Sequence, residues 1–120
     1  MVSKVSVTEV GNPDWPLQTL GASVVEGHPE ASGKITFQTE DKLIHGGVWA
    51  CSPGVFDLTF GWDEMAYLLE GELIIQESSG EEIQLKAGDF FFSSKGTQSR
   101  WLVKKPLKKI FFLRTAEPLG

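Results

Sequence analysis

Short stretches in which apolar and polar residues alternate follow one another along most of this chain. In FDLTF (56–60), Phe56, Leu58 and Phe60 fall on one face and polar residues on the other. EIQLKA (82–87) repeats the pattern. A period of two is typical of a strand with one buried face. Because no window has helical periodicity, the pattern predicts an all-β protein.

Glycine-centred turns separate these stretches. MAYLLEGELIIQE (65–77) predicts two strands around Glu70–Gly71, and ESSGEEIQL (77–85) predicts a second hairpin around Ser79–Gly80. Eight or more short antiparallel strands have edges that must be covered, and closing into a jelly-roll barrel does this within one small domain. We therefore predict a single-domain jelly-roll barrel over 26–120, preceded by an irregular or extended arm over 1–25.

Length and charge narrow the class of protein. The 120 residues are 41% hydrophobic, which suits one globular domain. No apolar run is long enough for a membrane span, and no signal peptide is evident. A net charge of −5 disfavours binding to nucleic acid. The one basic cluster, Lys104, Lys105, Lys108 and Lys109, is interpreted as a solvated strand edge and hairpin. The single Cys51 suits a reducing compartment, so we expect a cytoplasmic protein.

The spacing within two segments resembles the motifs of the cupin superfamily. Cupin barrels carry a first motif of two histidines, a glutamate and a glycine, and here GWDEMAYLLEGEL holds the last two as Glu64 and Gly71. In the second motif, Gly88 and Gly96 of GDFFFSSKG match, while Ser94 stands in the place of the proline. The resemblance implies a cupin jelly roll.

More of the chain is similar to the cupin domain of ureidoglycine aminohydrolase. The matching pieces extend from about residue 26 to residue 114; they are EGHPEASGK, GGVWACSPGVF, WDEMAYLLEGEL, KAGDFFFSSKGTQSRW and KKIFFLR. Cupins include enzymes, storage proteins and simple binders, so this resemblance supports the fold more than a function.

The resemblance also locates the family's metal ligands, and most are missing. The two histidines of the first motif would fall at Leu58 and Phe60, or with longer spacing at Asp57 and Thr59. The histidine of the second motif would fall at Ser99. Transition metals need imidazole, thiolate or several oxygen donors. We therefore predict no metal cofactor.

The chain has two histidines outside these motif positions, His28 and His45. His28 lies in a turn between glycine and proline and is expected to be exposed. An unusual site made of His45, Cys51 and Glu64 is conceivable, although nothing in their spacing requires it.

The inward positions predict an aromatic pocket with one carboxylate. The candidate lining residues are Trp49, Cys51, Phe56, Leu58, Phe60, Glu64, Tyr67, Ser99 and Trp101. An apolar cleft with few polar groups is the usual form of a small-molecule site, but inward aromatics are also ordinary core. Glu64 either faces a ligand or bonds to a backbone amide, Tyr67, Ser99 or Lys95. Cys51 is either a small buried hydrophobe or a nucleophile.

Three functions follow from this pocket. The first is a metal-free module that binds a small molecule, an amine or a ureide, with Glu64 as the countercharge. The second is an enzyme of the ureidoglycine aminohydrolase type, a hydrolase or isomerase in which Glu64 is the catalytic acid or base. The third is a structural or regulatory domain with a solidly packed barrel. Whether the chain is an enzyme stays open, with binding favoured.

We also expect a homodimer. A small barrel has edge strands to cover, and the contact elements expected are the N-terminal strand, IHGGVW (44–49) and KKIFFLR (108–114).

Overall fold

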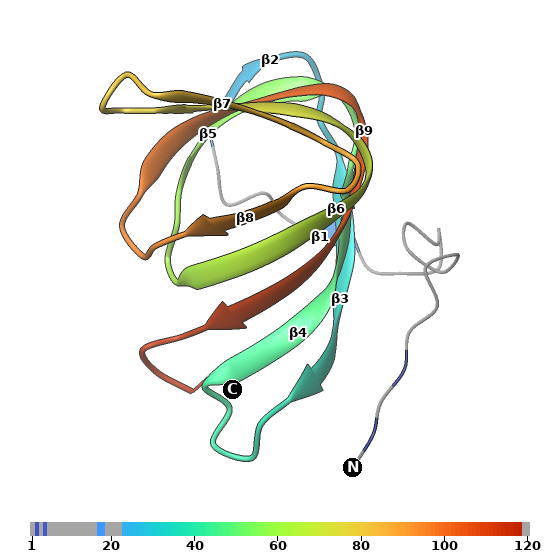
Figure 1. Cartoon of the computed structure of the whole chain (residues 1–120), viewed down its shortest axis with the longest axis vertical. Coiled ribbons are helices and arrows are strands. Elements are labelled where there is room, and N and C mark those ends of the chain that lie inside the picture. Colours follow the sequence, from blue (N-terminus) through green and yellow to red (C-terminus); the bar gives the residue numbers. More distant parts are fainter. Residues whose placement is uncertain (1, 3, 5–16, 19–22, 119–120) are drawn as a thin grey trace.

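The computed structural model describes residues 2, 4, 17–18 and 23–118, in which nine strands form one antiparallel sheet without any helix. The strands are β1 (Leu17–Gln18), β2 (Ser23–Glu26), β3 (Ala31–Gln38), β4 (Ile44–Cys51), β5 (Gly54–Thr59), β6 (Asp63–Glu77), β7 (Glu82–Lys86), β8 (Phe90–Ser93) and β9 (Gln98–Arg114). They curve around one interior (Figure 1). The predicted all-β, single-domain fold is confirmed. Among these residues there is accordingly no membrane-spanning helix.

Two long strands, β6 and β9, hold the barrel together. β6 pairs with β9 from Asp63↔Arg114 to Glu77↔Ser99. The other edge of β9 pairs with β5 in its first half and with β4 in its second half. β9 therefore belongs to both halves of the barrel, the one that contains β5 and the one that contains β4. The same holds for β6, which pairs with β9 over this length (Figure 1).

The predicted hairpin around Glu70–Gly71 is wrong, because β6 continues through it. The pairing with β9 shifts register between Leu68 and Leu73, so the two strands bend together. Gly71 has φ +104, and a Cβ there would lie 2.5 Å from the Pro106 carbonyl oxygen. Glycine is needed for this close approach and not for a turn, two features that look alike in a sequence.

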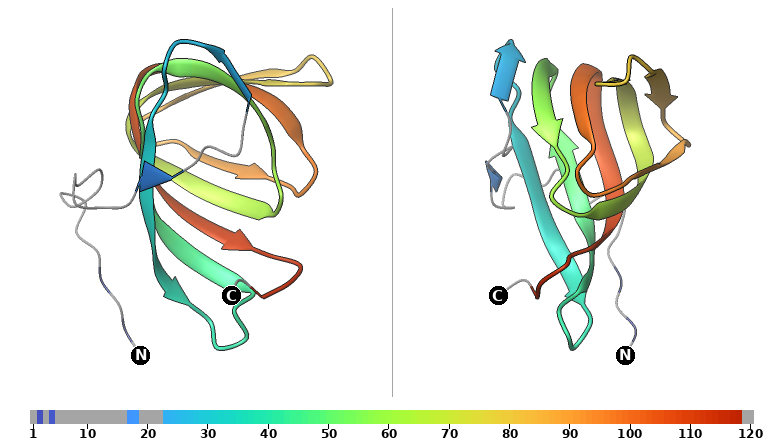
Figure 2. Two further views of the ribbon diagram at one scale, coloured as in Figure 1. Left: turned by 180° about the vertical axis from the view of Figure 1, so that it is seen from behind. Right: turned by 90° about the vertical axis from the view of Figure 1, so that its left-hand side faces the viewer.

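The second predicted turn, around Ser79–Gly80, is confirmed. β6 and β7 pair antiparallel, and the Gly80 amide donates to the Glu77 carbonyl oxygen at 2.9 Å. The hairpin projects from the barrel in the left view of Figure 2.

The segments before residue 26 that are described pair with the sheet. β1 lies against β3, and β2 lies against β5. The boundary expected at residue 25 falls within β2, and the rest of the predicted arm lies outside the described residues.

Aromatic side chains on alternate inward positions form the centre of the core. Trp101 is 1% exposed, and its ring centroid lies 5.8 Å from that of Phe56 and 6.1 Å from that of Phe60. Trp49 and Phe91 approach the same indole edge-on. These rings pack on one another, so much of the predicted pocket is hydrophobic core.

Candidate functional site

A buried ion pair lies in the barrel interior, where β6 presents Glu64 and β9 presents Lys109. The Lys109 Nζ donates to Glu64 Oε2 at 2.6 Å. The Trp62 Nε1 donates to the other oxygen, Oε1, at 2.9 Å. Both carboxylate oxygens therefore have a protein partner, which is what a buried carboxylate requires. The hydrogen-bond partners of Glu64 are thus Lys109 and Trp62, and not the backbone amide, Tyr67, Ser99 or Lys95 that the sequence suggested.

The interpretation of the lysine cluster as wholly solvated is wrong for Lys109. Its neighbours behave as expected, since Lys105 pairs with Glu72 and Lys108 pairs with Glu70 at the surface. Lys109, however, shares the inward side of β9 with Leu107 and is buried. Lys109 is buried because inward and outward positions alternate along β9. In the sequence this inward position cannot be recognised, because Lys109 lies in a run of charged residues.

Aromatic rings surround the Lys109 ammonium. Its Nζ lies 4.6 Å from the ring centroid of Trp49 and 5.1 Å from that of Trp101. Ring faces stabilise a cation at such distances. The predicted combination of aromatics, Glu64 and an ammonium is present, but the ammonium belongs to the chain itself. Glu64 is thus not a free countercharge for a ligand amine.

Most of the predicted pocket residues share this interior. Trp49, Cys51, Phe56, Leu58, Phe60 and Trp101 belong to or pack against the inner cluster, and Glu64 and Ser99 are buried on the inward sides of β6 and β9. Tyr67 does not join them. It alternates with buried Ala66 and Leu68 on β6, and its ring lies 5.0 Å from that of the exposed Phe90.

Cys51 has the environment of a structural residue. It is buried, and burial raises the pKa of its thiol to about 11, against the opposing effect of the Lys109 charge. The reactive form of cysteine is the thiolate, so at neutral pH this side chain is a weak nucleophile.

The positions of the family's metal ligands do not fit a divalent metal. Leu58 and Phe60 have no donor atom, and the Ser99 hydroxyl donates weakly to the Leu58 carbonyl oxygen at 3.5 Å. Glu64 already has a cation beside it, since the Lys109 ammonium is 2.6 Å away. One carboxylate bound to an ammonium does not provide the three or four ligands that hold such an ion.

The alternative site made of His45, Cys51 and Glu64 is not assembled. His45 is fully buried, with its Nδ1 3.1 Å from Gln38 Nε2 and its Nε2 3.4 Å from the Thr115 hydroxyl. Within the described part of the chain, no three His, Cys, Asp or Glu side chains gather as a metal site would require.

A groove of about 650 Å³ lies where β5 and β6 end and β9 begins. It is lined by Ser23, Asp57, Leu58, Thr59, Gln76, Glu77, Ser78, Gln98, Ser99 and Arg100. Leu58 and Ser99 connect it to the inward positions discussed above, whereas Glu64 and Lys109 do not line it.

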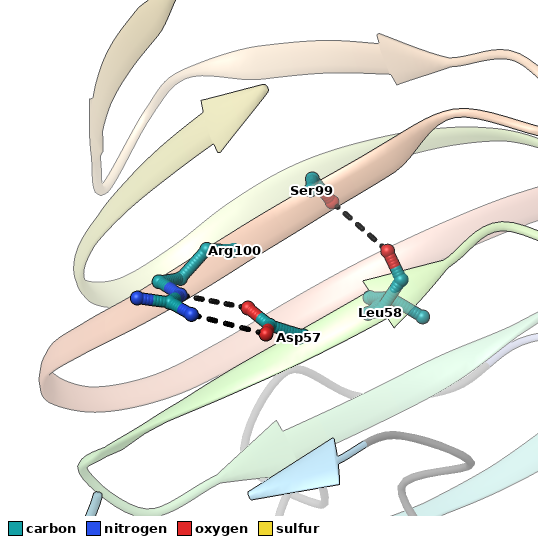
Figure 3. Close-up of polar contacts among 4 residues, drawn as sticks. All are labelled: Asp57, Leu58, Ser99 and Arg100. Carbon is teal, nitrogen blue, oxygen red and sulfur yellow. Dashed lines mark hydrogen bonds and ion pairs between the residues drawn. The ribbon is translucent and has the colours of Figure 1, made fainter. Parts of the chain in front are cut away.

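An ion pair between two neighbouring strands lines the groove. Arg100 Nε and Nη2 of β9 donate to the two Asp57 oxygens of β5 at 2.7 and 3.1 Å, drawn beside Ser99 and Leu58 in Figure 3. The Arg100 hydrogen bond holds the pKa of Asp57 below its usual value. A bidentate pair of this kind fixes both side chains in one geometry.

The remaining lining is polar, with hydroxyls from Ser23, Thr59 and Ser78 and side-chain amides from Gln76 and Gln98. Two carboxylates, Asp57 and Glu77, against one guanidinium leave a formal charge of −1. The sequence pattern predicts Leu58 and Ser99 as site residues, but it gives Asp57 only as an alternative motif position and does not indicate Arg100. Only the pairing Asp57↔Arg100 between β5 and β9 brings them together.

This fold, an antiparallel barrel whose motif positions lie around one interior, is that of a cupin. The family model of the EutQ-like cupin domain matches residues 38–111, more than half of the chain. The chain therefore belongs to the EutQ-like cupin domain family.

Solved structures show the same fold. The EutQ protein of Clostridium difficile is 23% identical with a TM-score of 0.65, and the match covers 94% of this chain and 81% of that one. A DUF861 family protein of unknown function from Pseudomonas syringae has a TM-score of 0.74 at 16% identity, over 82% of this chain and 43% of that one. A DUF861 family protein from Thermotoga maritima is 28% identical with a TM-score of 0.52, over 53% and 73%. No curated protein matches the chain significantly.

Proposed function

We propose that this cupin domain binds a small polar molecule, without a divalent metal, in the groove that Asp57 and Arg100 line. The observation that carries the proposal is the position of that groove. It reaches Leu58 and Ser99, where cupin motifs place ligand-binding side chains, and it offers hydrogen-bonding groups from four strands. Concave sites with a few converging polar groups are the usual places for small ligands.

The Lys109–Glu64 pair supports the metal-free part of the proposal. In a metal-binding cupin the glutamate of the first motif would face a cation supplied from solution. Here the Lys109 ammonium, 2.6 Å from Glu64 Oε2, supplies that positive charge from within the chain. A second cation beside it would be repelled and would find no imidazole.

The groove's chemistry favours an amine or a ureide over an anion. Hydroxyl and amide groups both donate and accept hydrogen bonds, so they suit a molecule with N–H and C=O groups. The formal charge of −1 from Asp57, Glu77 and Arg100 attracts a cationic ligand, admits a neutral one and repels a carboxylate. A cytoplasmic location is part of this proposal, since the one cysteine, Cys51, is buried as a free thiol.

An enzyme of the ureidoglycine aminohydrolase type is the alternative that the test must separate from binding. Its proton transfer would use Glu64, whose two oxygens are bonded to Trp62 and Lys109. Taking a proton from a substrate would require one of these bonds to open. We therefore propose that Glu64 has a structural role in the barrel and not a catalytic one.

The test is a thermal-shift and calorimetric screen of amines, urea derivatives and carboxylates in the presence of a chelator. A ligand that binds only the folded state raises the melting temperature. We expect an amine or ureide to do so, and Asp57→Asn to weaken its binding several-fold. The matched control is Asp63→Asn, another carboxylate paired to an arginine but outside the groove.

Three outcomes would contradict the proposal. The first is a rise in melting temperature that requires added metal. The second is an equal loss of ligand binding in Asp57→Asn and Asp63→Asn. The third is that no amine or ureide raises the melting temperature. Turnover of a ureide that disappears in Glu64→Gln while binding survives would instead establish the enzyme.

A further inference from the structure

The groove that Asp57 and Arg100 line contains a second carboxylate, that of Glu77, the last residue of β6. Ser99 of β9 lines the groove beside it. We propose that Glu77 and Ser99 together bind the ammonium group of a primary amine, so that the ligand is neither a ureide nor a quaternary ammonium. This inference rests on the proposed function, and it names the class of ligand and the residue that selects it.

Strand register brings Glu77 next to Ser99. Glu77 pairs with Ser99 between β6 and β9, and Ser99 pairs with Leu58 between β9 and β5. Residues directly opposite on paired strands point to the same side of a sheet, with Cβ atoms about 5 Å apart. Ser99 is 6% exposed, and Glu77 alternates in phase with the buried Leu73 and Ile75 of β6. Both side chains therefore point to the inward side of the sheet, where one small group can contact them together.

The charge of Glu77 is not balanced within the part of the chain that the structure describes. Asp57, in the same groove, receives hydrogen bonds from Arg100 at both of its oxygens. None of the ion pairs among the described residues includes Glu77, whose side chain accepts a long hydrogen bond of 3.4 Å from Ser79. The formal charge of −1 in the groove is therefore located at Glu77, and a cationic group of the ligand is attracted there.

Ser99 provides a second acceptor at this position. Its hydroxyl donates to the Leu58 carbonyl oxygen at 3.5 Å, which is a weak bond, and the hydroxyl oxygen can itself accept. A primary ammonium has three N–H donors and no acceptor, so it can donate to Glu77 and Ser99 at once. A hydrogen bond from an ammonium to a carboxylate is about twice as strong as one between neutral groups.

The lining of the groove also distinguishes a primary ammonium from a quaternary one. A quaternary ammonium has no N–H donor and is recognised by the faces of aromatic rings. Among the described residues that line the groove none is aromatic, and the one aliphatic side chain is Leu58. The rings of Trp49 and Trp101 instead surround the ammonium of Lys109. The groove therefore suits a cation that donates hydrogen bonds.

A ureide would satisfy this position less well than an amine. Its N–H groups can donate to Glu77, but it carries no charge and leaves the carboxylate without a counterion. The sequence predicts Glu64 as the countercharge of a ligand amine. Because the Lys109 ammonium already lies 2.6 Å from Glu64 Oε2, we assign that role to Glu77.

The test compares three probes that share one body: 3-aminopropanamide, its N-trimethylated derivative and 3-ureidopropanamide. Their dissociation constants are measured by calorimetry at pH 7 in the presence of a chelator. We expect the primary amine to bind about tenfold more tightly than either other probe, since it alone combines a charge with N–H donors. This comparison uses the unaltered chain, so it does not depend on the folding of a variant.

Two variants then assign the binding to the proposed residues. Glu77→Gln keeps the shape of the side chain and removes its charge, so it should weaken binding of 3-aminopropanamide about tenfold. It should change binding of 3-ureidopropanamide by less than about twofold. Ser99→Ala should weaken binding of the amine several-fold. Circular dichroism and the thermal melt check that both variants are folded.

The matched control is Glu81→Gln, which removes the same charge from the turn between β6 and β7, at a residue outside the groove. This variant should bind 3-aminopropanamide like the unaltered chain. Equal losses in Glu77→Gln and Glu81→Gln would mean that the amine responds to the overall charge of the protein, and this would overturn the inference.

The inference is also overturned if either the ureide or the trimethylated probe binds as tightly as the amine, or if Glu77→Gln leaves binding of the amine unchanged. The proposed function survives each of these results if Asp57→Asn still weakens binding of the probe that does bind. If none of the three probes binds, this inference fails, and the wider screen of amines and urea derivatives decides the proposed function separately.

Discussion

Lys109 Nζ lies 2.6 Å from Glu64 Oε2 in the barrel interior, and each side chain is less than a tenth exposed. The two residues come from the two longest strands, and 45 positions of sequence separate them. A buried pair of this kind is costly to break, because removing one partner leaves an uncompensated charge. The stability of the barrel therefore depends on keeping both members of this pair.

Removing one member of this pair should destabilise the protein strongly. We expect Lys109→Met to lower the free energy of unfolding by about 3–5 kcal/mol, measured by urea denaturation. The double variant Glu64→Gln/Lys109→Met should recover part of this loss, since no charge is left unpaired. Lys105→Met, in the exposed pair with Glu72, is the control and should cost less than about 1 kcal/mol. A cost this small for Lys109→Met would show that the buried pair is not formed.

Divalent metals should affect the purified protein little. Because Leu58, Phe60 and Ser99 offer no nitrogen or thiolate, zinc, nickel or manganese should not raise the melting temperature. Elemental analysis of untreated protein should find no stoichiometric transition metal. About one metal per chain, lost in Glu64→Gln or His45→Ala, would contradict this prediction and favour a metal-dependent enzyme.

Stability should fall in acid partly through the two exposed aspartate–arginine pairs. The pKa of Asp57 is lowered chiefly by the Arg100 hydrogen bond, and that of Asp63 chiefly by the Lys95 amide and then by Arg114. A carboxyl whose pKa is lower in the folded state binds its proton more readily when unfolded. Its contribution is therefore present above the ordinary value near 3.8 and is lost as pH falls through the lower folded value.

Denaturation midpoints measured from pH 6 to pH 2.5 check this. The double variant Asp57→Asn/Asp63→Asn should show a shallower loss below pH 4 than the unaltered chain. Parallel curves for the two proteins would mean that these carboxyls titrate alike in the folded and unfolded states.

The Cys51 thiol should resist labelling while the protein is folded. Because its pKa is raised to about 11 by burial, little thiolate forms at pH 8. We expect a disulfide reagent to react slowly with the native chain at pH 8 and rapidly after denaturation. Native labelling as fast as that of a free thiol would show that Cys51 is reached by solvent and activated, which would revive its candidacy as a nucleophile.

A side chain at Gly71 should disturb the joint bend of β6 and β9. Its φ of +104 and the close Pro106 oxygen leave no room for a Cβ, so Gly71→Ala should cost about 1–3 kcal/mol of unfolding free energy. Gly61→Ala is the control, since nothing lies within 4 Å of a Cβ there and its φ is not positive. The two variants, compared by urea denaturation, should differ clearly. Equal stability of the two variants would show that the bend does not require glycine at position 71.

Local pattern alone was enough to predict the fold class and much of the inward surface. Alternation in FDLTF places Phe56, Leu58 and Phe60 on one side, and all three contact the core. A period of two is a property of single strands, so it can be recognised without knowing which strands pair. The cupin resemblance likewise depended on spacings within continuous segments, and the family comparison confirmed it.

Tertiary structure decided the features that depend on which strands meet. The bend at Gly71 has the same sequence signature as a hairpin, and only β9 continuing beside it distinguishes the two. The Asp57–Arg100 pair requires the register of β5 against β9. The charge of Glu64 is balanced by Lys109, which the sequence places in a solvated basic run. Local propensity contains no information about contacts between distant positions, so the partner of a buried charge is known only once the barrel is closed.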